Sequence, residues 1–523
     1  MTSPTSPDAP DTERRRLLAG GALAAGTALL PAFAHAAQAA PGRTTGAISA
    51  ADYLALDASA MAEAVRRRQL SPAELMAAAM TRCDAVNPVV NAVVMRHDAR
   101  AHALLAAGAG RGGALAGVPM LVKDLQTHLA GTVTTNGSRL FRDAPPSTRS
   151  STIVERYEAA GSTVFGKTAS PEFGMTTTTE SRQWGQTRNP WNLKYSAGGS
   201  SGGAAAAVAA GIVPAAHATD GGGSIRIPAS YCGLFGLKPS RYRTPAGPQR
   251  FEGWFGASVG HVVSRSVRDS ALLLDVGQGH EEGSPYWSAP LERPFVAELK
   301  RPPGKLRVAL VDQALTGAPL DPQIRRTLDD TVRLLLGLGH AVDAARLGLD
   351  AGQLFGAHGA VVGAALQATV RDREQELGRT LLADELETVT QHVLRRASDV
   401  TGEGLYRARQ GFESVTMTME SLFARYDVIL SPVTATLTPL LGALSLDQPY
   451  ESYGRAAMGS AAFTIPANVG GQPSMSVPLG WSNEGLPIGM MFTARIGAEG
   501  LLFRLAAQLE RERPWAAKRA PLA

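Results

Sequence analysis

The sequence predicts an α/β protein built on one large, mixed, twisted β-sheet with helices covering both faces. Short, fully apolar runs that are typical of buried strands are interspersed with longer helical patterns along the chain. The chain of 523 residues exceeds the usual size of one domain, although α/β enzymes can keep a single large core. Hydrophobic residues make up 44% and charged residues 19%, which suits a soluble globular enzyme. We therefore expect one catalytic domain over residues 40–523.

Residues 1–39 have the pattern of an export signal. A polar start leads to Glu13-Arg14-Arg15-Arg16-Leu17-Leu18, and a Gly/Ala/Leu stretch then runs to Ala34. This arrangement resembles a twin-arginine signal peptide. The apolar part is short and weakly hydrophobic, so no stable membrane anchor is expected. We predict export of the folded protein to the periplasm or beyond, which agrees with its few cysteines because it folds where thiols stay reduced.

Helical and strand patterns can be assigned in order after the leader. Residues 51–68 carry apolar side chains at helical spacing, and Ser71-Pro72-Ala73-Glu74 is a capping box that opens a second helix through Cys83. Asn87-Pro88 is expected to end that helix. The apolar run from Val118 to Lys123 predicts a short buried strand.

Residues 161–168 fit the phosphate-loop pattern G-x-x-x-x-G-K-T, but their context does not. A true phosphate loop follows a strand and opens a helix. Here a helix is predicted at 151–160, residues 162–165 are themselves strand-like, and Pro171 follows directly. We reject a phosphate site and expect a structural role for Lys167.

The chemistry is expected between Tyr195 and Pro239, where glycines and serines cluster twice. Glycine is concentrated where the backbone must adopt positive φ or approach another group closely. Three successive glycines can turn several N–H groups toward one point, which is the geometry of an oxyanion or phosphate site. Between the clusters, Ala204 to Ala210 predicts a tightly packed helix whose positive N-terminus lies beside the first pair of serines. The clusters are Gly198, Gly199, Gly202 and Gly203 around Ser200 and Ser201, and Gly221, Gly222 and Gly223 before Ser224.

Strand and helix patterns continue to alternate in the second half of the chain, apart from residues 354–410, which are mostly helical. Apolar runs predict strands at 306–311, 428–430 and 474–478, and helical spacing predicts helices at 266–277, 321–339 and 501–510.

The glycine-serine stretch resembles the amidase signature hydrolases. It contains GGSSGG, D-G-G-G-S-I-R-I-P-A-S and C-G-L-F-G-L-K-P at that family's separations, and G-V-P-M-L-V-K-D and A-N-V-G-G-Q-P-S-M-S-V-P-L-G extend the match from about Ala51 to the C-terminus. The resemblance implies the amidase signature fold and hydrolysis of a carboxylic amide through an acyl-enzyme. It also implies that the helical region, at about 321–425, is variable and shapes the substrate site. The chain departs from the family at Gly221, where a threonine or isoleucine is usual; this loosens the turn but keeps its N–H group.

The same resemblance assigns a catalytic triad. Ser224 is the implied nucleophile, Ser200 the bridging proton carrier after a cis Gly199-Ser200 bond, and Lys123 the ultimate base. A serine hydroxyl is a weak nucleophile until a nearby base takes its proton, and a lysine can do so only when it is neutral. The remaining site residues are the amides of Gly221, Gly222, Gly223 and Ser224 for the oxyanion, Ser201 within the site, and Asp220 paired with Arg226 to brace the turn.

Within the family, several stretches look most like aminohexanoate cyclic-dimer hydrolases. They are W-G-Q-T-R-N-P-W-N-L at 184–193, S-P-V-T at 431–434 and the tail from Phe463. The implied substrate is a linear or cyclic amide, a peptide amide or an aryl amide. An aminoacyl-tRNA amidotransferase subunit is disfavoured because the leader would carry the chain away from tRNA.

Two rival functions remain to be tested. Gly199 to Gly203 also fits the nucleophile elbow G-x-S-x-G of an α/β-hydrolase, with Ser201 as nucleophile and a later histidine, His340, His358 or His392, as base. That esterase-like alternative leaves the second serine motif unexplained. A non-catalytic binding protein on the same fold is the other alternative, and the complete lysine-serine-serine set argues against it.

Composition argues against several other partners. Cys83 and Cys232 are too few for a disulfide scaffold or a thiolate metal site, and no metal-binding motif is present, so neither a metal nor another cofactor is expected. His217 is assigned a packing role. The net charge of +5 is small, and no basic run with interleaved aromatics predicts nucleic-acid binding. We expect a monomer or homodimer.

Overall fold

The computed structural model describes residues 48–288 and 290–522, so the predicted leader lies outside the described residues. Its main sheet has eight strands in the order β12-β11-β13-β15-β14-β9-β10-β8. Strand β11 runs parallel to both of its neighbours, whereas the other pairs are antiparallel, which confirms a mixed sheet. The strands are β8 (Ala215–Asp220), β9 (Phe235–Lys238), β10 (Val259–Ser264), β11 (Arg307–Leu310), β12 (Ala341–Ala344), β13 (Val428–Pro432), β14 (Ser474–Trp481) and β15 (Pro487–Thr493).

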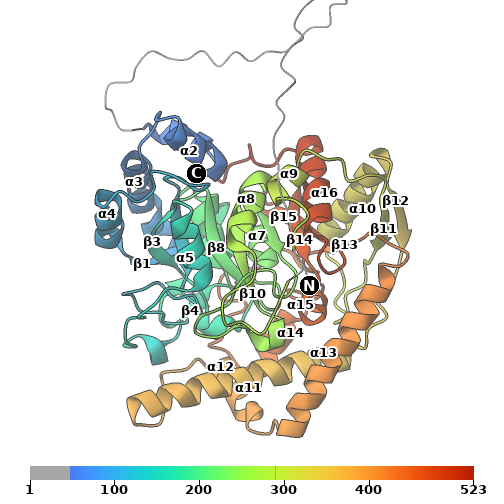
Figure 1. Cartoon of the computed structure of the whole chain (residues 1–523). Coiled ribbons are helices and arrows are strands. Elements are labelled where there is room, and N and C mark those ends of the chain that lie inside the picture. The colour runs from blue at the N-terminus through green and yellow to red at the C-terminus, as the bar shows by residue number, and fades with distance from the viewer. Residues whose placement is uncertain (1–47, 289, 523) are drawn as a thin grey trace, which may run out of the picture. The chain divides into compact units, whose positions relative to one another are not determined.

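Helices cover both faces of this sheet (Figure 1). Neighbouring residues of a strand point to opposite faces, so β15 shows which helices lie on each side. Met490 and Phe492 face a core shared with α8 (Val267–Gly277), α10 (Pro322–Gly337) and α16 (Glu499–Glu512). Met491 faces the opposite core, which contains Ile227 and Tyr231 of α7 (Arg226–Cys232). The predicted fold class is therefore confirmed.

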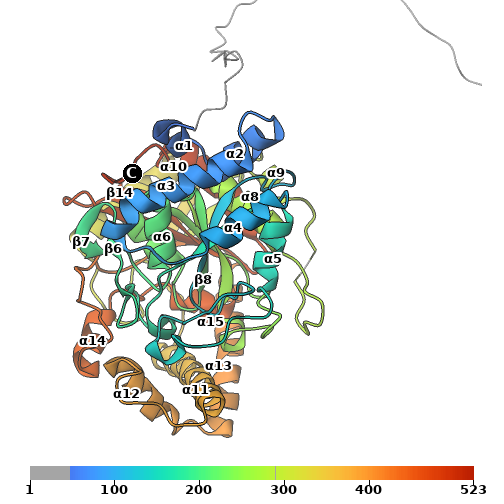
Figure 2. The ribbon, with the colours of Figure 1, turned by 90° about the vertical axis from the view of Figure 1, so that its left-hand side faces the viewer.

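A second, smaller sheet carries the predicted lysine. It has the order β1-β3-β2, with β1 (Val93–Arg96), β3 (Thr163–Thr168) and β2 (Pro119–Lys123), and β2 packs beside the edge strand β8. The core around it includes α3 (Pro72–Val90) and α6 (Gly202–Ala209), and Figure 2 shows both helices on the side of β8. Two sheets therefore meet where β2 ends, an arrangement that the sequence did not indicate.

The N-terminal helices differ from the prediction at their ends. The expected helix over 51–68 is two helices, α1 (Ala50–Ala55) and α2 (Ala58–Arg66), because the side chain of Asp57 accepts a hydrogen bond from Ala60 N and begins a new helix. The capping box at Ser71 and Glu74 is confirmed. Its helix does not stop at Asn87-Pro88 but continues to Val90, since Pro88 lies in the last turn and the chain leaves the helix only at Asn91, whose φ is 51°.

The rejected phosphate loop is part of a strand. Gly166, Lys167 and Thr168 lie within β3, downstream of α5 (Thr152–Ala159), and open no helix. Lys167 Nζ donates to Val133 O at 2.6 Å and to Thr134 Oγ1 at 2.7 Å, which confirms its structural role.

A group of long helices lies at one end of the main sheet (Figures 1 and 2). It consists of α11 (Ala351–Leu377), α12 (Thr388–Ala397) and α13 (Gly402–Leu422), and α12 and α13 both pack against α11. Helix α10, which we had included in this region, instead packs on the main sheet with β14 and β15. No described helix is long and apolar enough to cross a membrane.

Candidate active site

Lys123 ends β2 in a buried cluster of hydroxyl groups. Its Nζ lies 2.7 Å from Ser200 Oγ, 2.9 Å from Ser201 Oγ and 3.0 Å from Thr219 Oγ1, and none of the lysine side chain is exposed. The neighbouring Asp124 is not its partner, since that carboxylate accepts from Thr135 N and Trp184 Nε1 instead. The structure thus joins two residues that are 77 positions apart in the sequence, Lys123 and Ser200.

Burial favours the neutral form of this lysine, which is the form that a base requires. Desolvation lowers the pKa of Lys123 well below its usual range, and the carboxylate of Asp220 only partly opposes that effect. A neutral amine has two N–H groups and one lone pair. Ser201 already donates its hydroxyl hydrogen to Thr219 O at 3.1 Å, so toward Lys123 it can only accept. The hydroxyl of Ser200 remains able to donate to the lone pair of the amine, which is the direction that base catalysis requires.

The first glycine cluster holds Ser200 by close backbone contacts. The Gly199-Ser200 peptide bond is cis, as expected. A Cβ added to Gly199 would lie 2.3 Å from Thr178 O, so only glycine fits there. Ser201 is the N-cap of α6, and every residue of that helix is buried. Its run of alanines and glycines is therefore explained by tight packing.

The second glycine cluster forms a turn between β8 and α7 that is braced by Asp220. The Asp220 carboxylate accepts from Gly223 N at 2.8 Å, Ile225 N at 3.0 Å and Asn468 Nδ2 at 2.8 Å, and from Arg226 Nη2 at 2.9 Å. The predicted pair of Asp220 and Arg226 is confirmed, and both side chains are fully buried. Burial alone would raise the pKa of Asp220, but the charge and hydrogen bonds of Arg226 outweigh it and hold the pKa below its usual range.

The turn offers fewer free amides than the sequence suggested. Because Gly223 N–H donates to Asp220, it is not available for an oxyanion in this structure. Among the described residues, no acceptor is recorded for the N–H groups of Gly221, Gly222 and Ser224. The predicted cradle of four donors is thereby reduced to three.

Ser224 is half-buried at the end of this turn. Its hydroxyl makes no hydrogen bond with any other described residue, so the structure does not join it directly to Ser200 or Lys123. The link between the two glycine clusters is instead Thr219, which contacts Lys123 and lies two residues before Gly221. No role was predicted for Thr219. It is followed by Asp220 at the end of β8, and because neighbouring strand residues point to opposite faces, the two side chains point to opposite sides.

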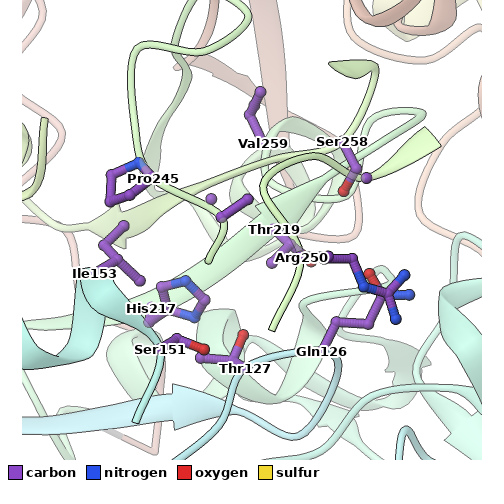
Figure 3. A pocket seen from close by; sticks show the side chains of 13 residues that line it. Gln126, Thr127, Ser151, Ile153, His217, Thr219, Pro245, Arg250, Ser258 and Val259 are labelled. Carbon is purple, nitrogen blue, oxygen red and sulfur yellow. The ribbon is translucent and has the colours of Figure 1, made fainter. Parts of the chain in front are cut away.

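A pocket lined by both polar and apolar residues borders the same threonine. It encloses about 490 Å³ including its open mouth, and Figure 3 shows Thr219, His217 and Arg250 among the side chains that line it. His217 is buried, and its Nδ1 has no partner within the described part of the chain. Burial lowers the pKa of His217 to about 3, so the ring is neutral. The histidine that we had assigned to packing therefore forms part of a pocket wall beside the hydroxyl cluster around Lys123.

The nucleophile-elbow alternative requires a histidine that hydrogen-bonds to the nucleophilic serine, and the described residues do not provide one. Over residues 48–288 and 290–522, no histidine hydrogen-bonds to Ser200, Ser201 or Ser224. The three candidates are engaged elsewhere: His340 with Leu306 N and Gln508 Oε1, His392 stacked on Tyr450, and His358 with Gly221 O. The described residues also contain no group of three or more His, Cys, Asp or Glu side chains that could hold a metal ion.

Comparisons with known proteins identify the family. A family model described as Amidase matches residues 74–503. The 6-aminohexanoate-cyclic-dimer hydrolase of Paenarthrobacter ureafaciens is 37% identical over 480 residues, covering 89% of this chain and 96% of that protein. A solved structure of 6-aminohexanoate cyclic dimer hydrolase matches with a TM-score of 0.85 at 36% identity, over 90% of this chain and 99% of that one. A bacterial aryl acylamidase of the amidase signature enzymes matches with a TM-score of 0.80 at 29% identity, over 88% and 97% of the two chains. The chain therefore belongs to the amidase signature family and is an amidase, a hydrolase that acts on amide C–N bonds.

Proposed function

We propose that the protein is an exported amidase that uses Ser224 as nucleophile, Ser200 as proton carrier and Lys123 as base. The observation that carries the proposal is the 2.7 Å contact between the buried Lys123 Nζ and Ser200 Oγ, in a site where burial lowers the pKa of the lysine. The mechanism requires the Ser224 side chain, which has no recorded partner, to turn toward Ser200 when the substrate binds.

The proposed reaction has two stages. Ser224 Oγ bonds to the amide carbonyl carbon while its proton passes to Ser200, whose own proton passes to Lys123. The C–N bond then breaks, and the leaving amine takes a proton back through Ser200, which leaves an acyl-enzyme and a neutral lysine. Water then bonds to the ester carbon while its proton passes through Ser200 to Lys123. The C–O bond to Ser224 breaks, Ser224 Oγ takes the proton back through Ser200, and the carboxylic acid is released.

The free amides of the turn support stabilisation of the oxyanion. The negative charge that develops on the carbonyl oxygen is held by N–H groups of Gly221, Gly222 and Ser224. One such donor is worth about 3 to 4 kcal/mol of transition-state stabilisation. The bracing of the turn by Asp220 favours this role because it fixes the donors before the substrate arrives.

The proposed substrate is a linear or cyclic amide, a peptide amide or an aryl amide. The names of two matched proteins, a cyclic-dimer hydrolase and an aryl acylamidase, favour the cyclic and aryl members of this set. A panel of cyclic amides, aryl amides, peptide amides and matching esters, assayed with the mature enzyme, ranks these classes by kcat/KM. Ester turnover without amide turnover would contradict the proposal.

A fluorophosphonate probe tests the nucleophile without a known substrate. We expect the wild type to be labelled on Ser224, and Ser224→Ala to be neither labelled nor active. Ser270→Ala is the matched control, because Ser270 is a fully buried serine whose Oγ lies 2.9 Å from His261 Nε2, the kind of pair that an elbow mechanism would use. Labelling of Ser201 would support the esterase alternative, and no labelling of the wild type would support a binding protein.

Export is proposed from the leader sequence alone. A chain with its own first 39 residues is expected in the periplasm or medium of a host that has the twin-arginine pathway. Replacement of Arg14, Arg15 and Arg16 by lysine is expected to retain the protein in the cytoplasm. Fractionation followed by activity measurement distinguishes the outcomes, and export that survives the triple replacement would contradict this route.

A further inference from the structure

In the turn that carries the proposed nucleophile, the carbonyl groups of the three glycines each accept a hydrogen bond from a different element. His358 Nε2 donates to Gly221 O at 3.0 Å, and Thr464 Oγ1 donates to Gly222 O at 2.6 Å. Ile227 N, in the first turn of α7, donates to Gly223 O at 2.8 Å. The three donors come from α11, from the residue before α15 (Ile465–Gly470), and from α7.

Each of these contacts also sets the direction of one N–H group. In a trans peptide the carbonyl and the following N–H point in opposite directions, and the peptides of this turn are trans. Thr464 therefore directs the N–H of Gly223, which reaches Asp220. The contact from Ile227 directs the N–H of Ser224. His358 directs the N–H of Gly222, one of the three donors left for an oxyanion.

The peptide held by His358 has little else to fix it. It joins two glycines, which have no side chains and can adopt a wide range of backbone angles. A Cβ added to Gly221 would lie 2.4 Å from the indole of Trp254, so the ring already fills the place of a side chain at this position. Trp254 limits the room around the peptide, but only His358 hydrogen-bonds to the Gly221 carbonyl within the described residues.

His358 lies on the buried face of α11, and that face packs toward the glycine turn. Leu354, His358 and Val361 follow the i, i+4, i+7 spacing of one helix face, and both apolar residues belong to the core that includes Ala257 and Val469. The His358 ring meets Trp254 edge-on with centroids 5.9 Å apart. Burial lowers the pKa of His358, and because a carbonyl can only accept, the ring nitrogen that faces it must carry the hydrogen.

We propose that His358 is a positioning residue of the amidase reaction, which holds the Gly221-Gly222 peptide so that Gly222 N–H faces the oxygen of the substrate carbonyl. The proposal rests on the function proposed above, since it assigns the support of an oxyanion site that belongs to Ser224. It extends the role of the helical region, because α11 then supplies a group that acts on the reacting atoms through the main chain.

The experiment compares side chains that carry a donor at the position of the histidine Nε2, at another position, or not at all. The amide nitrogen of a Gln side chain matches the position of the histidine Nε2. The side chain of Asn is shorter, and its amide nitrogen matches the position of Nδ1. His358→Gln is expected to keep the rate within a few-fold of the wild type, and His358→Asn and His358→Leu to lose about tenfold to a hundredfold, part of the effect of removing one oxyanion donor. The measurement is the saturation kinetics of fluorophosphonate labelling, with the limiting rate separated from the half-saturation concentration.

The expected loss lies in the limiting rate, with the half-saturation concentration changed less than about twofold, because the contact matters when negative charge develops. Thermal unfolding of each variant shows whether it is folded. His392→Asn is the control, a histidine of the neighbouring α12 that stacks on Tyr450. Wild-type rates in His358→Asn and His358→Leu, or a loss in His358→Gln as large as in His358→Leu, would overturn the proposal.

Failure of this inference and failure of the proposed function give different results. If Ser224 is labelled in the wild type and the His358 series shows no loss, the nucleophile stands and the role of His358 falls. If the wild type is not labelled on Ser224, the proposed function and the role of His358 fall together.

Discussion

An ion pair beside the candidate site and an ion pair in the helical region use charge in opposite ways. In the core, Asp220 and Arg226 are fully buried and each is bonded to segments far away in the sequence. On α13, Arg407 and Glu403 form an i, i+4 pair whose side chains are both 72% exposed. The first pair is shielded from water, whereas the second is screened by it, and yet the buried face of α11 in the same helical region supplies the hydrogen bond from His358 to Gly221 O. A region whose surface is largely exposed can therefore still supply one specific hydrogen bond to a buried turn.

The largest expected effect comes from removing the buried amine. Lys123→Met replaces it with an apolar chain of similar size, and we expect kcat/KM for the best amide of the panel to fall by about 10³-fold or more, as for members of a catalytic unit. Stability in urea is expected to stay equal or rise, because a buried lysine is costly to desolvate. A variant that is unstable, or that retains near-wild-type turnover at neutral pH, would contradict the role of Lys123.

The second largest expected effect is a loss of folding stability when the buried Arg226 is replaced. Arg226→Met leaves the carboxylate of Asp220 buried without its countercharge, and we expect the free energy of unfolding to fall by about 3 to 5 kcal/mol. Equilibrium unfolding in urea measures the change. The double variant with Asp220→Asn removes both charges and is expected to recover part of the loss; no recovery would show that packing, and not charge, dominates at this pair.

The pH dependence of the rate tests whether burial keeps the lysine neutral. The pKa of Lys123 in the folded protein is lowered, so the neutral base is lost as pH falls through that lowered value and is complete above it. We expect kcat/KM to rise by about tenfold per pH unit on the acid side and then to level off well below the ordinary lysine pKa of about 10.4. The residual activity of Lys123→Met is expected to lack this rise. If kcat/KM of the variant rises with pH as in the wild type, the rise belongs to the titration of a group other than Lys123.

The smallest expected effect lies in the helical region. Arg407→Met removes the exposed pair with Glu403, and we expect a change in unfolding free energy of only about 0.3 to 0.5 kcal/mol, with no change in kcat. Addition of salt should reduce even that difference, because exposed charges are screened. A loss as large as that of Arg226→Met would erase the contrast between the two regions.

Local patterns were sufficient for the elements that carry the main candidates. The strand ending at Lys123, the helix of alanines after Ser201 and the capping box at Ser71 are all present as predicted. Each depends on residues adjacent in sequence: an apolar run, a run of small helix formers, and a serine and a glutamate three positions apart. The role of Asp220 and Arg226 was also visible locally, because the two flank one turn.

Strand β8 was not predicted, and its composition explains why. Its sequence, Ala-Ala-His-Ala-Thr-Asp, has no β-branched apolar residue, and apolar and polar residues alternate only over Ala216 to Thr219, where the apolar positions are alanines. It is a strand because it pairs with β10 and packs between β2 and α6, where small side chains are needed. Strands β9, β10 and β15 were missed as well, since glycines interrupt their apolar patterns.

The sequence by itself determined the family and the α/β class, and it marked Lys123, Ser200 and Ser224 as the candidate site residues, because glycine clusters and short apolar strands are local signals. Only the tertiary structure decided which groups surround them. It brought Thr219 to the lysine, assigned the amide of Gly223 to Asp220, and placed His358 on the carbonyl of Gly221. These contacts join residues from different sheets and helices, and such pairings depend on how the elements pack, which no local pattern records.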